Sequence, residues 1–339
     1  MTRRPAFVVA LVAALSLGVA ACSSDAETEP ETTDAPDTAE TEDADAGDDA
    51  AAEPVAITIG ALSISETAPL WAAVDAGIFD EYGLDVTVQP IQGGAQAMPA
   101  LVNGDVDFSV GQPFGALRAS LQGLDVKIIA NYASSYAEGD DINAVVAAAG
   151  SDIASPADLA GKRVAVNSLG AAGDLTISAA VEADGGDPST IEFVEVAFPD
   201  AKGQLEAGNI DAAWVPEPFV SMIVGAGGSV VVYPYQAVLP GLPTLVIQAT
   251  GSTVSDDPEL VTKVREAFTA AFAWAAENDD AVRQALVDNL ELPAEAAAGL
   301  PLPTFTTDLD RDLIQGLADL AVEHGYFDSA PDLAQIIAE

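Results

Sequence analysis

The side chains of this sequence that could do chemistry stand mainly in turns that directly follow apolar, strand-like runs. Most of these turns also open helices, where free backbone N–H groups attract anionic groups, while hydroxyl and amide side chains orient a small molecule by hydrogen bonds. This placement predicts a binding pocket, although each residue taken alone could be an ordinary helix cap. The candidate ligand-binding residues are Ser63, Ser65, Glu66, Trp71, Gln92, Gly93, Gln112, Pro113, Tyr132, Asn167, Ser168, Gly170, Asp200, Trp214 and Glu217.

Covalent and metal chemistry have few candidate residues. Cys22 is the only cysteine, and the only histidine, His324, precedes Gly325 at an expected helix end, where imidazole complements the helix dipole. A Ser–His–Asp triad, a Cys–His pair or a Cys/His metal site therefore cannot readily be assembled. Gly170 and Gly173 lack the spacing of a dinucleotide fingerprint, and no phosphate-loop lysine follows them. We expect no enzymatic activity, cofactor or metal, although chemistry based on carboxylates alone stays open.

Two stretches with the same order of residue types position two of the candidates. In each, a glycine can end a helix, an apolar run enters a sheet, and a proline suits the start of the next helix. Gln112 and Glu217 then stand at equivalent strand ends, and we expect them to face one cleft from two related lobes. Alternatively, helix, turn and strand simply recur, as in any α/β protein. The two stretches match residue by residue at seven positions. The first has Leu101, Gly104, Asp105, Val106, Asp107, Pro113 and Phe114, and the second has Leu205, Gly208, Asn209, Ile210, Asp211, Pro218 and Phe219.

The elements that carry these turns alternate between strands and helices, which predicts an α/β fold. The chain becomes helical from Pro258 onward. We expect two lobes, the first built from residues 55–147 and 241–339 and the second from 148–240. The chain would cross between them twice, which forms a hinge. Expected strands are 55–62, 86–91, 106–110, 126–131, 142–148, 163–167, 191–196, 230–233 and 245–249, and the final helices are 259–277, 279–290, 308–324 and 333–338.

The N-terminal region is typical of an exported protein that receives a lipid. Arg3 and Arg4 precede an apolar run over 7–17, and small residues stand before Cys22, where bacterial lipoprotein signals place the thiol that is acylated. We therefore expect a signal peptide over 1–21 and lipidation at Cys22. Residues 22–54 are acidic, without a basic or aromatic side chain, and predict a disordered tether. The folded part would then stand on the extracytoplasmic face of the cell membrane.

The charge of the chain restricts its partners. With 54 acidic and 11 basic residues, the net charge is −43 at pH 7. Nucleic acid is excluded as a partner because the phosphate backbone would be repelled. Strong acidity favours solubility and opposes contact with anionic lipid, so membrane attachment would rely on the lipid anchor alone.

Several separated motifs resemble one family of transport proteins. Three short runs resemble the first helix and second strand of the nitrate, sulfonate and taurine substrate-binding proteins of ABC importers. They are Pro69-Leu70-Trp71, Gly77-Ile78-Phe79 and Tyr82-Gly83-Leu84-Asp85-Val86. The runs 161–167, 211–214 and 217–219 resemble that family's second lobe. The resemblance implies a two-lobed, periplasmic-binding-protein-like fold of the second topological type, a monomer, and a membrane permease with its ATPase as partners. A related yeast thiamine-pyrimidine synthase uses a histidine and a cysteine-rich motif that this chain lacks.

The class of ligand stays open between alternatives. The resemblance implies a sulfonate, nitrate or taurine type of ligand, which would rely on helix N-termini and hydroxyls. An aromatic and acidic pocket could instead bind a pyrimidine or thiamine precursor, another heterocycle or an amine. Its residues would be Trp71, Tyr132, Tyr136, Trp214, Glu66 and Glu217. A lipid-anchored sensor that presents its ligand to a receptor is a further alternative. The basic residues closest to strand ends are Arg118, Lys127, Lys162, Arg163 and Lys202.

Overall fold

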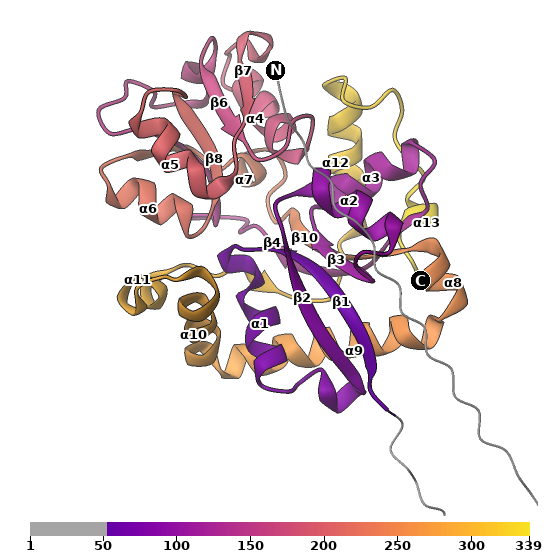
Figure 1. Cartoon of the computed structure of the whole chain (residues 1–339). Helices are drawn as coiled ribbons and strands as arrows, with labels where there is room; N and C mark the ends of the chain where they lie inside the picture. Colours follow the sequence, from indigo (N-terminus) through magenta and orange to yellow (C-terminus); the bar gives the residue numbers. More distant parts are fainter. Residues whose placement is uncertain (1–52) are drawn as a thin grey trace, which may run out of the picture. The chain divides into compact units, whose positions relative to one another are not determined.

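A computed structural model describes residues 53–339 of the chain (Figure 1). The predicted signal peptide, Cys22 and almost all of the predicted tether lie outside the described residues. Within this range, the helices are all too short or too polar to span a bilayer.

The first sheet has six strands in the order β11-β4-β10-β3-β1-β2. Strand β1 is parallel to β2 and β3, whereas β10 is antiparallel to β3 and β4 and lies between them. Leu62 pairs with Ile91, so Ser63 and Gln92 leave the sheet side by side at its carboxyl edge. The bounds are β1 (Val55–Leu62), β2 (Leu84–Ile91), β3 (Phe108–Gly111), β4 (Val126–Ser134), β10 (Pro243–Thr250) and β11 (Thr304–Phe305).

The second sheet has five strands in the order β7-β6-β8-β5-β9. The sequence analysis placed the strand near 142–148 at the end of the first lobe, but β5 pairs with β8 and β9 of the second sheet. An apolar run shows that a strand is buried without showing which neighbours bury it, and here Val145 lies opposite Trp214 and Val232. The bounds are β5 (Asn143–Ala147), β6 (Arg163–Val166), β7 (Glu192–Glu195), β8 (Ala212–Pro216) and β9 (Ser229–Val232).

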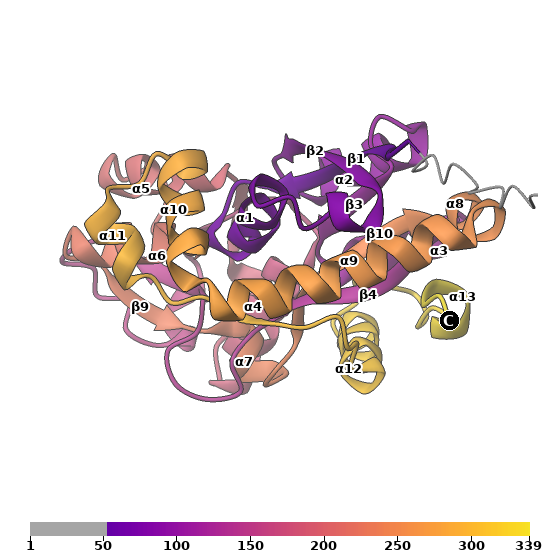
Figure 2. The same ribbon diagram turned by 90° about the horizontal axis from the view of Figure 1, so that it is seen from below.

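Helices pack around the two sheets (Figure 1). The long helix α9 runs beside α1 and β4 (Figure 2). Short 3-10 turns lie at Ser65–Thr67, Asp80–Tyr82, Pro156–Leu159 and Pro188–Thr190. The helices are α1 (Ala68–Asp75), α2 (Gly94–Asn103), α3 (Pro113–Leu121), α4 (Ala172–Ala183), α5 (Phe198–Glu206), α6 (Phe219–Gly225), α7 (Pro234–Val238), α8 (Gly251–Asp256), α9 (Pro258–Glu277), α10 (Asp279–Leu290), α11 (Ala294–Gly299), α12 (Arg311–Glu323) and α13 (Leu333–Ile336).

Both copies of the recurring stretch have the expected local structure. Helix α2 ends before Gly104 and α5 ends near Gly208, and both glycines adopt positive φ angles, of 77° and 69°, that side chains resist. Strands β3 and β8 follow, and α3 and α6 come after them. The sequence pattern therefore predicted a helix, turn, strand and helix correctly in each sheet.

An aromatic cluster forms part of the core beside the first sheet. The ring of Tyr132 lies 5.0 Å from Phe272, 5.8 Å from Phe268 and 6.0 Å from Phe305, each in an edge-to-face arrangement. Tyr132 is fully buried. This cluster fixes α9 against β4, and the Tyr132 ring packs within it as part of the core.

Candidate functional site

Three hollows lie along the junction between elements of the two sheets. Their volumes are about 380, 10 and 590 Å³. The first and second share Gln112, and the second and third share Leu62, Ile64 and Phe198. Because neighbouring hollows share wall residues, they lie next to one another along this junction; we call the row of three hollows the cleft and the smallest, central one its floor.

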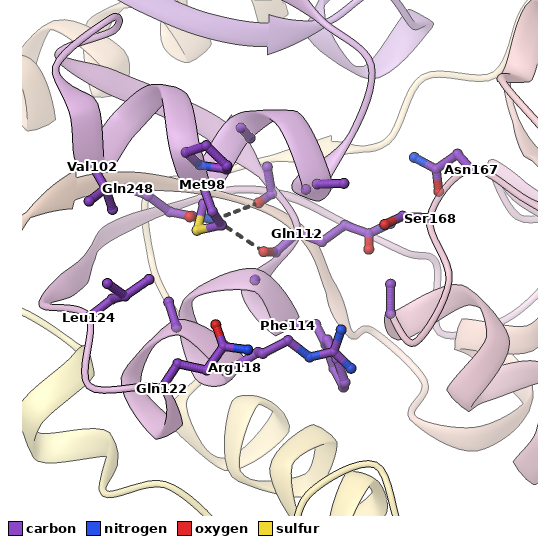
Figure 3. Close-up of a pocket in the computed structure, with 18 of the residues that line it drawn as sticks. Met98, Val102, Gln112, Phe114, Arg118, Gln122, Leu124, Asn167, Ser168 and Gln248 are labelled. Atoms are coloured by element: carbon purple, nitrogen blue, oxygen red, sulfur yellow. Dashed lines mark hydrogen bonds between the residues drawn. The ribbon is translucent and has the colours of Figure 1, made fainter. Parts of the chain in front are cut away.

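The hollow of about 380 Å³ receives three of the predicted residues, Gln112, Asn167 and Ser168 (Figure 3). Asn167 and Ser168 follow β6 and face Gln112, the N-cap residue of α3, across the hollow. Gln248 of β10 donates to the carbonyl oxygens of Gly111 (3.2 Å) and Gln112 (3.1 Å), which holds this turn in place. Polar groups from both sheets thus converge on one space.

Arg118 is a binding candidate that the sequence analysis named among the basic residues near strand ends but did not include among the ligand-binding residues. Its guanidinium lies 5.2 Å from the ring centre of Phe114, and the side chain lines the same hollow with Met98 and Leu124. Within residues 53–339, Arg118 takes part in none of the ion pairs. By contrast, the other four basic candidates pair with Asp125, Asp152, Asp211 and Glu206. The i, i+4 spacing of Phe114 and Arg118 on α3 was the signal that could have found it.

The hollow of about 590 Å³ receives Ser63 and Gln92. Both residues follow paired strand ends, as described above, and Phe198 and Pro199 at the start of α5 form the opposite wall. The backbone N–H of Gln92 donates to Gln96 Oε1 at 2.9 Å. The polar side chains of this hollow all come from the first-sheet side, and the other side is apolar.

The cleft floor is the hollow of about 10 Å³, which receives the predicted residues Glu66 and Trp214. Thr244 Oγ1 donates to Glu66 Oε1 at 2.7 Å, and Gln112 Nε2 donates to the Tyr235 hydroxyl at 3.0 Å. Glu66 is 2% exposed, and this burial, together with the charge of Asp141, raises its pKa from 4.5 to about 7. The floor therefore holds an acid whose charge changes near neutral pH.

Trp214 is held by close packing on several sides. Its ring lies 5.6 Å from both Phe198 and Tyr235. A Cβ atom at Gly173 would lie 2.8 Å from the indole, so only glycine lets the start of α4 approach so closely. Tyr235 and Asn143 complete this part of the floor, and the sequence analysis missed both. Their positions, at a helix start and at the first residue of an apolar strand, carried a weak signal.

Glu217 does not line these hollows, contrary to our expectation that it faces the cleft. Its carboxylate accepts hydrogen bonds from the backbone N–H (3.1 Å) and hydroxyl (2.9 Å) of Ser221, so it caps α6. Its backbone carbonyl accepts from Ser65 N and Ser65 Oγ, both at 3.0 Å. These two hydrogen bonds link the turn after β1 of the first sheet to the turn after β8 of the second. Burial raises the pKa of the Glu217 carboxyl.

Several other predicted residues lie away from the cleft hollows in the described part of the chain. Trp71 packs against Val282 and Leu286 of α10, because the apolar face of α1 turns toward the C-terminal helices. Tyr132 belongs to the aromatic cluster. Pro113 is buried at the start of α3, and Asp200 is exposed in the first turn of α5. These four residues serve packing or helix starts rather than the cleft surface.

Two predicted glycines lie where the turns of the two sheets approach each other most closely. A Cβ atom at Gly93 would lie 2.9 Å from Asn167 Nδ2, and one at Gly170 would lie 2.9 Å from a guanidinium nitrogen of Arg118. Gly170 has a φ angle of 64° and Gly93 of 147°, which other residues rarely adopt. Their role is to let the two walls meet.

Solved structures share this fold at low sequence identity. The aliphatic sulphonate binding protein SsuA from Escherichia coli matches with a TM-score of 0.68 and 20% identity, over 83% of this chain and 97% of that chain. The alkanesulfonate-binding protein SsuA from Xanthomonas axonopodis pv. citri, bound to MOPS, gives 0.72 and 18%, over 85% and 100%. The nitrate-binding protein NrtA from Synechocystis PCC 6803 gives 0.69 and 15%, over 84% and 86%.

These neighbours are binding proteins with a periplasmic-binding-protein-like fold, which confirms the predicted fold class. A search of curated protein sequences found no match. The family model described as NMT1/THI5 like matches residues 64–282, which is more than half of the chain and contains all three hollows except for parts of their rims. The chain therefore belongs to the NMT1/THI5 like family.

Proposed function

We propose that the chain is an extracytoplasmic solute-binding protein that captures a small molecule in the cleft and delivers it to an ABC permease. Family membership and the solute-binding neighbours support this role. The observation that carries it is the hollow of about 380 Å³, into which Gln112 points from one sheet's side and Asn167 and Ser168 from the other. Such a site binds by closing two walls on a ligand, which a monomer can do.

The proposal includes a lipid anchor at Cys22 and a cytoplasmic ATPase as the permease's partner. The anchor rests on the N-terminal sequence pattern, and the permease and ATPase rest on the family. Presentation of the ligand to a membrane sensor instead of a permease is the alternative role. Genes for a permease and an ATPase beside this one would support transport over sensing.

The first ligand class to test is a small sulfonate, nitrate or taurine. Arg118 lines the hollow of about 380 Å³ beside the amides of Gln112 and Asn167, and its guanidinium supports an anionic group there, since arginine binds such oxygens in a fixed fork. A second candidate, a heterocycle or an amine, is favoured by Glu66, Trp214 and Tyr235 at the floor.

Calorimetric titration of the full chain with taurine, ethanesulfonate and nitrate tests the first class. If one of them binds through Arg118, Arg118→Gln should lose about 10-fold or more in affinity, as expected for a charged hydrogen bond. Lys202→Gln is the matched control, since Lys202 pairs with Glu206 on α5. Binding that is equal in both variants would place the anion elsewhere. Small-angle scattering should show a smaller radius of gyration at saturation, and an unchanged value would argue against closure.

A further inference from the structure

The cleft floor contains two hydrogen-bond donors that have no partner. Trp214 Nε1 and Asn143 Nδ2 are buried atoms without a hydrogen bond, and their residues are 2% and 3% exposed. The Asn143 side chain approaches the Glu66 carboxyl as a donor and lowers its pKa, but Asn143 Nδ2 does not reach the distance and angle of a regular hydrogen bond, so its donor stays available to a further group. Buried donors are nearly always satisfied in folded proteins, so two on one hollow indicate that a further group binds there.

The same hollow offers an acceptor. Glu66 Oε1 accepts from Thr244, and the carboxyl borders the space that Trp214 and Asn143 also line. Its volume of about 10 Å³ suits one water or one small polar group of a larger molecule. The two larger hollows on either side can hold the remainder of that molecule.

The charges around the floor are negative. Asp141 is buried and contributes to the raised pKa of Glu66, and burial followed by the charges of Glu66, Asp141 and Asp174 raises the pKa of Tyr235. Within residues 53–339, the ion pairs leave these three acids without a basic partner. A sulfonate or carboxylate at this point would face like charge in a poorly solvated space, which is unfavourable.

We propose that Glu66, Asn143 and Trp214 form a subsite for a ligand group that carries an N–H or O–H donor beside an acceptor atom, and that this subsite rejects anionic groups. An amide, or the N–H and neighbouring carbonyl or ring nitrogen of a heterocycle, has this arrangement. The donor would bind Glu66, and the acceptor would receive Trp214 Nε1 and Asn143 Nδ2. This inference rests on the proposed function. It allows an anionic group elsewhere on the ligand, at Arg118.

The test uses the purified full chain and, as its probe, a small-molecule extract of the cells that express it. After incubation and washing, the retained compounds are released and identified by mass spectrometry. The wild type should retain a compound with an uncharged or cationic donor beside an acceptor. At about pH 8, where the Glu66 carboxyl is ionised, Glu66→Gln should retain the compound at least about 10-fold less, the factor for a charged hydrogen bond. Glu217→Gln is the matched control, since that buried acid caps α6, and it should retain the compound as the wild type does.

A second variant separates binding from folding. Trp214→Phe removes the Nε1 donor and keeps an aromatic ring, and it should retain the compound several-fold less while its far-ultraviolet circular dichroism stays that of the wild type. A retained compound whose polar groups are all anionic, or equal retention by the wild type, Glu66→Gln and Trp214→Phe, would overturn the subsite but leave the proposed function standing. If the wild type retains no compound above a protein without a cleft, the proposed function fails instead.

Discussion

Glu66 should make the stability of this protein depend on pH in a direction opposite to that of most carboxylates. Its pKa is 4.5 when exposed and about 7 in the folded chain, mainly because burial penalises the charged form. The folded state therefore holds the proton more tightly than the unfolded state. Stability from this group is complete below about pH 4.5 and is lost as pH rises to about 7.

The size of the effect follows from the same shift. One pKa unit corresponds to about 1.4 kcal/mol, so ionised Glu66 costs the folded state about 3 to 3.5 kcal/mol at about pH 8. Gln at this position resembles the protonated acid and cannot ionise. Glu66→Gln should thus be within about 1 kcal/mol of the wild type in stability at about pH 5 and more stable by about 3 kcal/mol at about pH 8, although it should bind its ligand more weakly.

Urea denaturation of the full chain at both pH values, followed by tryptophan fluorescence, measures this difference. Asp141, Tyr235 and Tyr132 also surround Glu66, and they remain in both proteins, so their titration largely cancels in the comparison. The exposed Glu81→Gln is the matched control and should follow the wild type at each pH. If Glu66→Gln and the wild type lose or gain the same free energy between the two pH values, Glu66 does not hold its proton as described here.

Three further predictions concern single positions. Cys22→Ser should move the protein from the membrane fraction to the soluble fraction, because stable attachment needs the acyl chains, and unchanged retention would remove the lipid anchor from the proposal. Glu217→Gln should lower the free energy of unfolding by about 1 kcal/mol by weakening the cap of α6, with unchanged affinity by titration; a loss of affinity alone would return Glu217 to the cleft. Gly170→Ala should cost about 1 to 2 kcal/mol, since its φ angle is 64° and the new Cβ would meet Arg118, whereas Gly94→Ala has open space and should be neutral by thermal melting.

The sequence predicted the elements better than their partners. Alternation and helical spacing located most strands and the long C-terminal helices, because those periods reflect which face of each element is buried. They missed the short elements α7, α8, α11 and β11, which span too few residues to show a period. They could not assign β5 to a sheet, since a run buried on both faces looks the same in either one. The order of the elements and the recurring stretches predicted two lobes, and the motif resemblance supplied the periplasmic-binding-protein-like fold type.

The candidate site was predictable where a residue directly follows a strand and its side chain has no other task. Ser63, Gln92 and Asn167 meet this condition and line the cleft. Glu217 occupies an equivalent place, but its carboxylate is used by Ser221, a contact that depends on the exact turn before α6. The prediction that Trp71 lines the cleft was wrong for a related reason. A helix carries apolar residues on the face that it buries, and the sequence does not show whether that face meets a cleft or another helix.

The position of β10 between β3 and β4 determines when each half of the protein can be completed as the chain is made or exported. All five strands of the second sheet lie between Asn143 and Val232, so they are available before Thr250, the end of β10, has emerged. Until then the edges of β3 and β4 that face β10 have no partner for their backbone groups, and unpaired edges invite association with other chains. The half that begins first is therefore finished last, and its early strands are the part of the nascent chain that most needs protection by a chaperone.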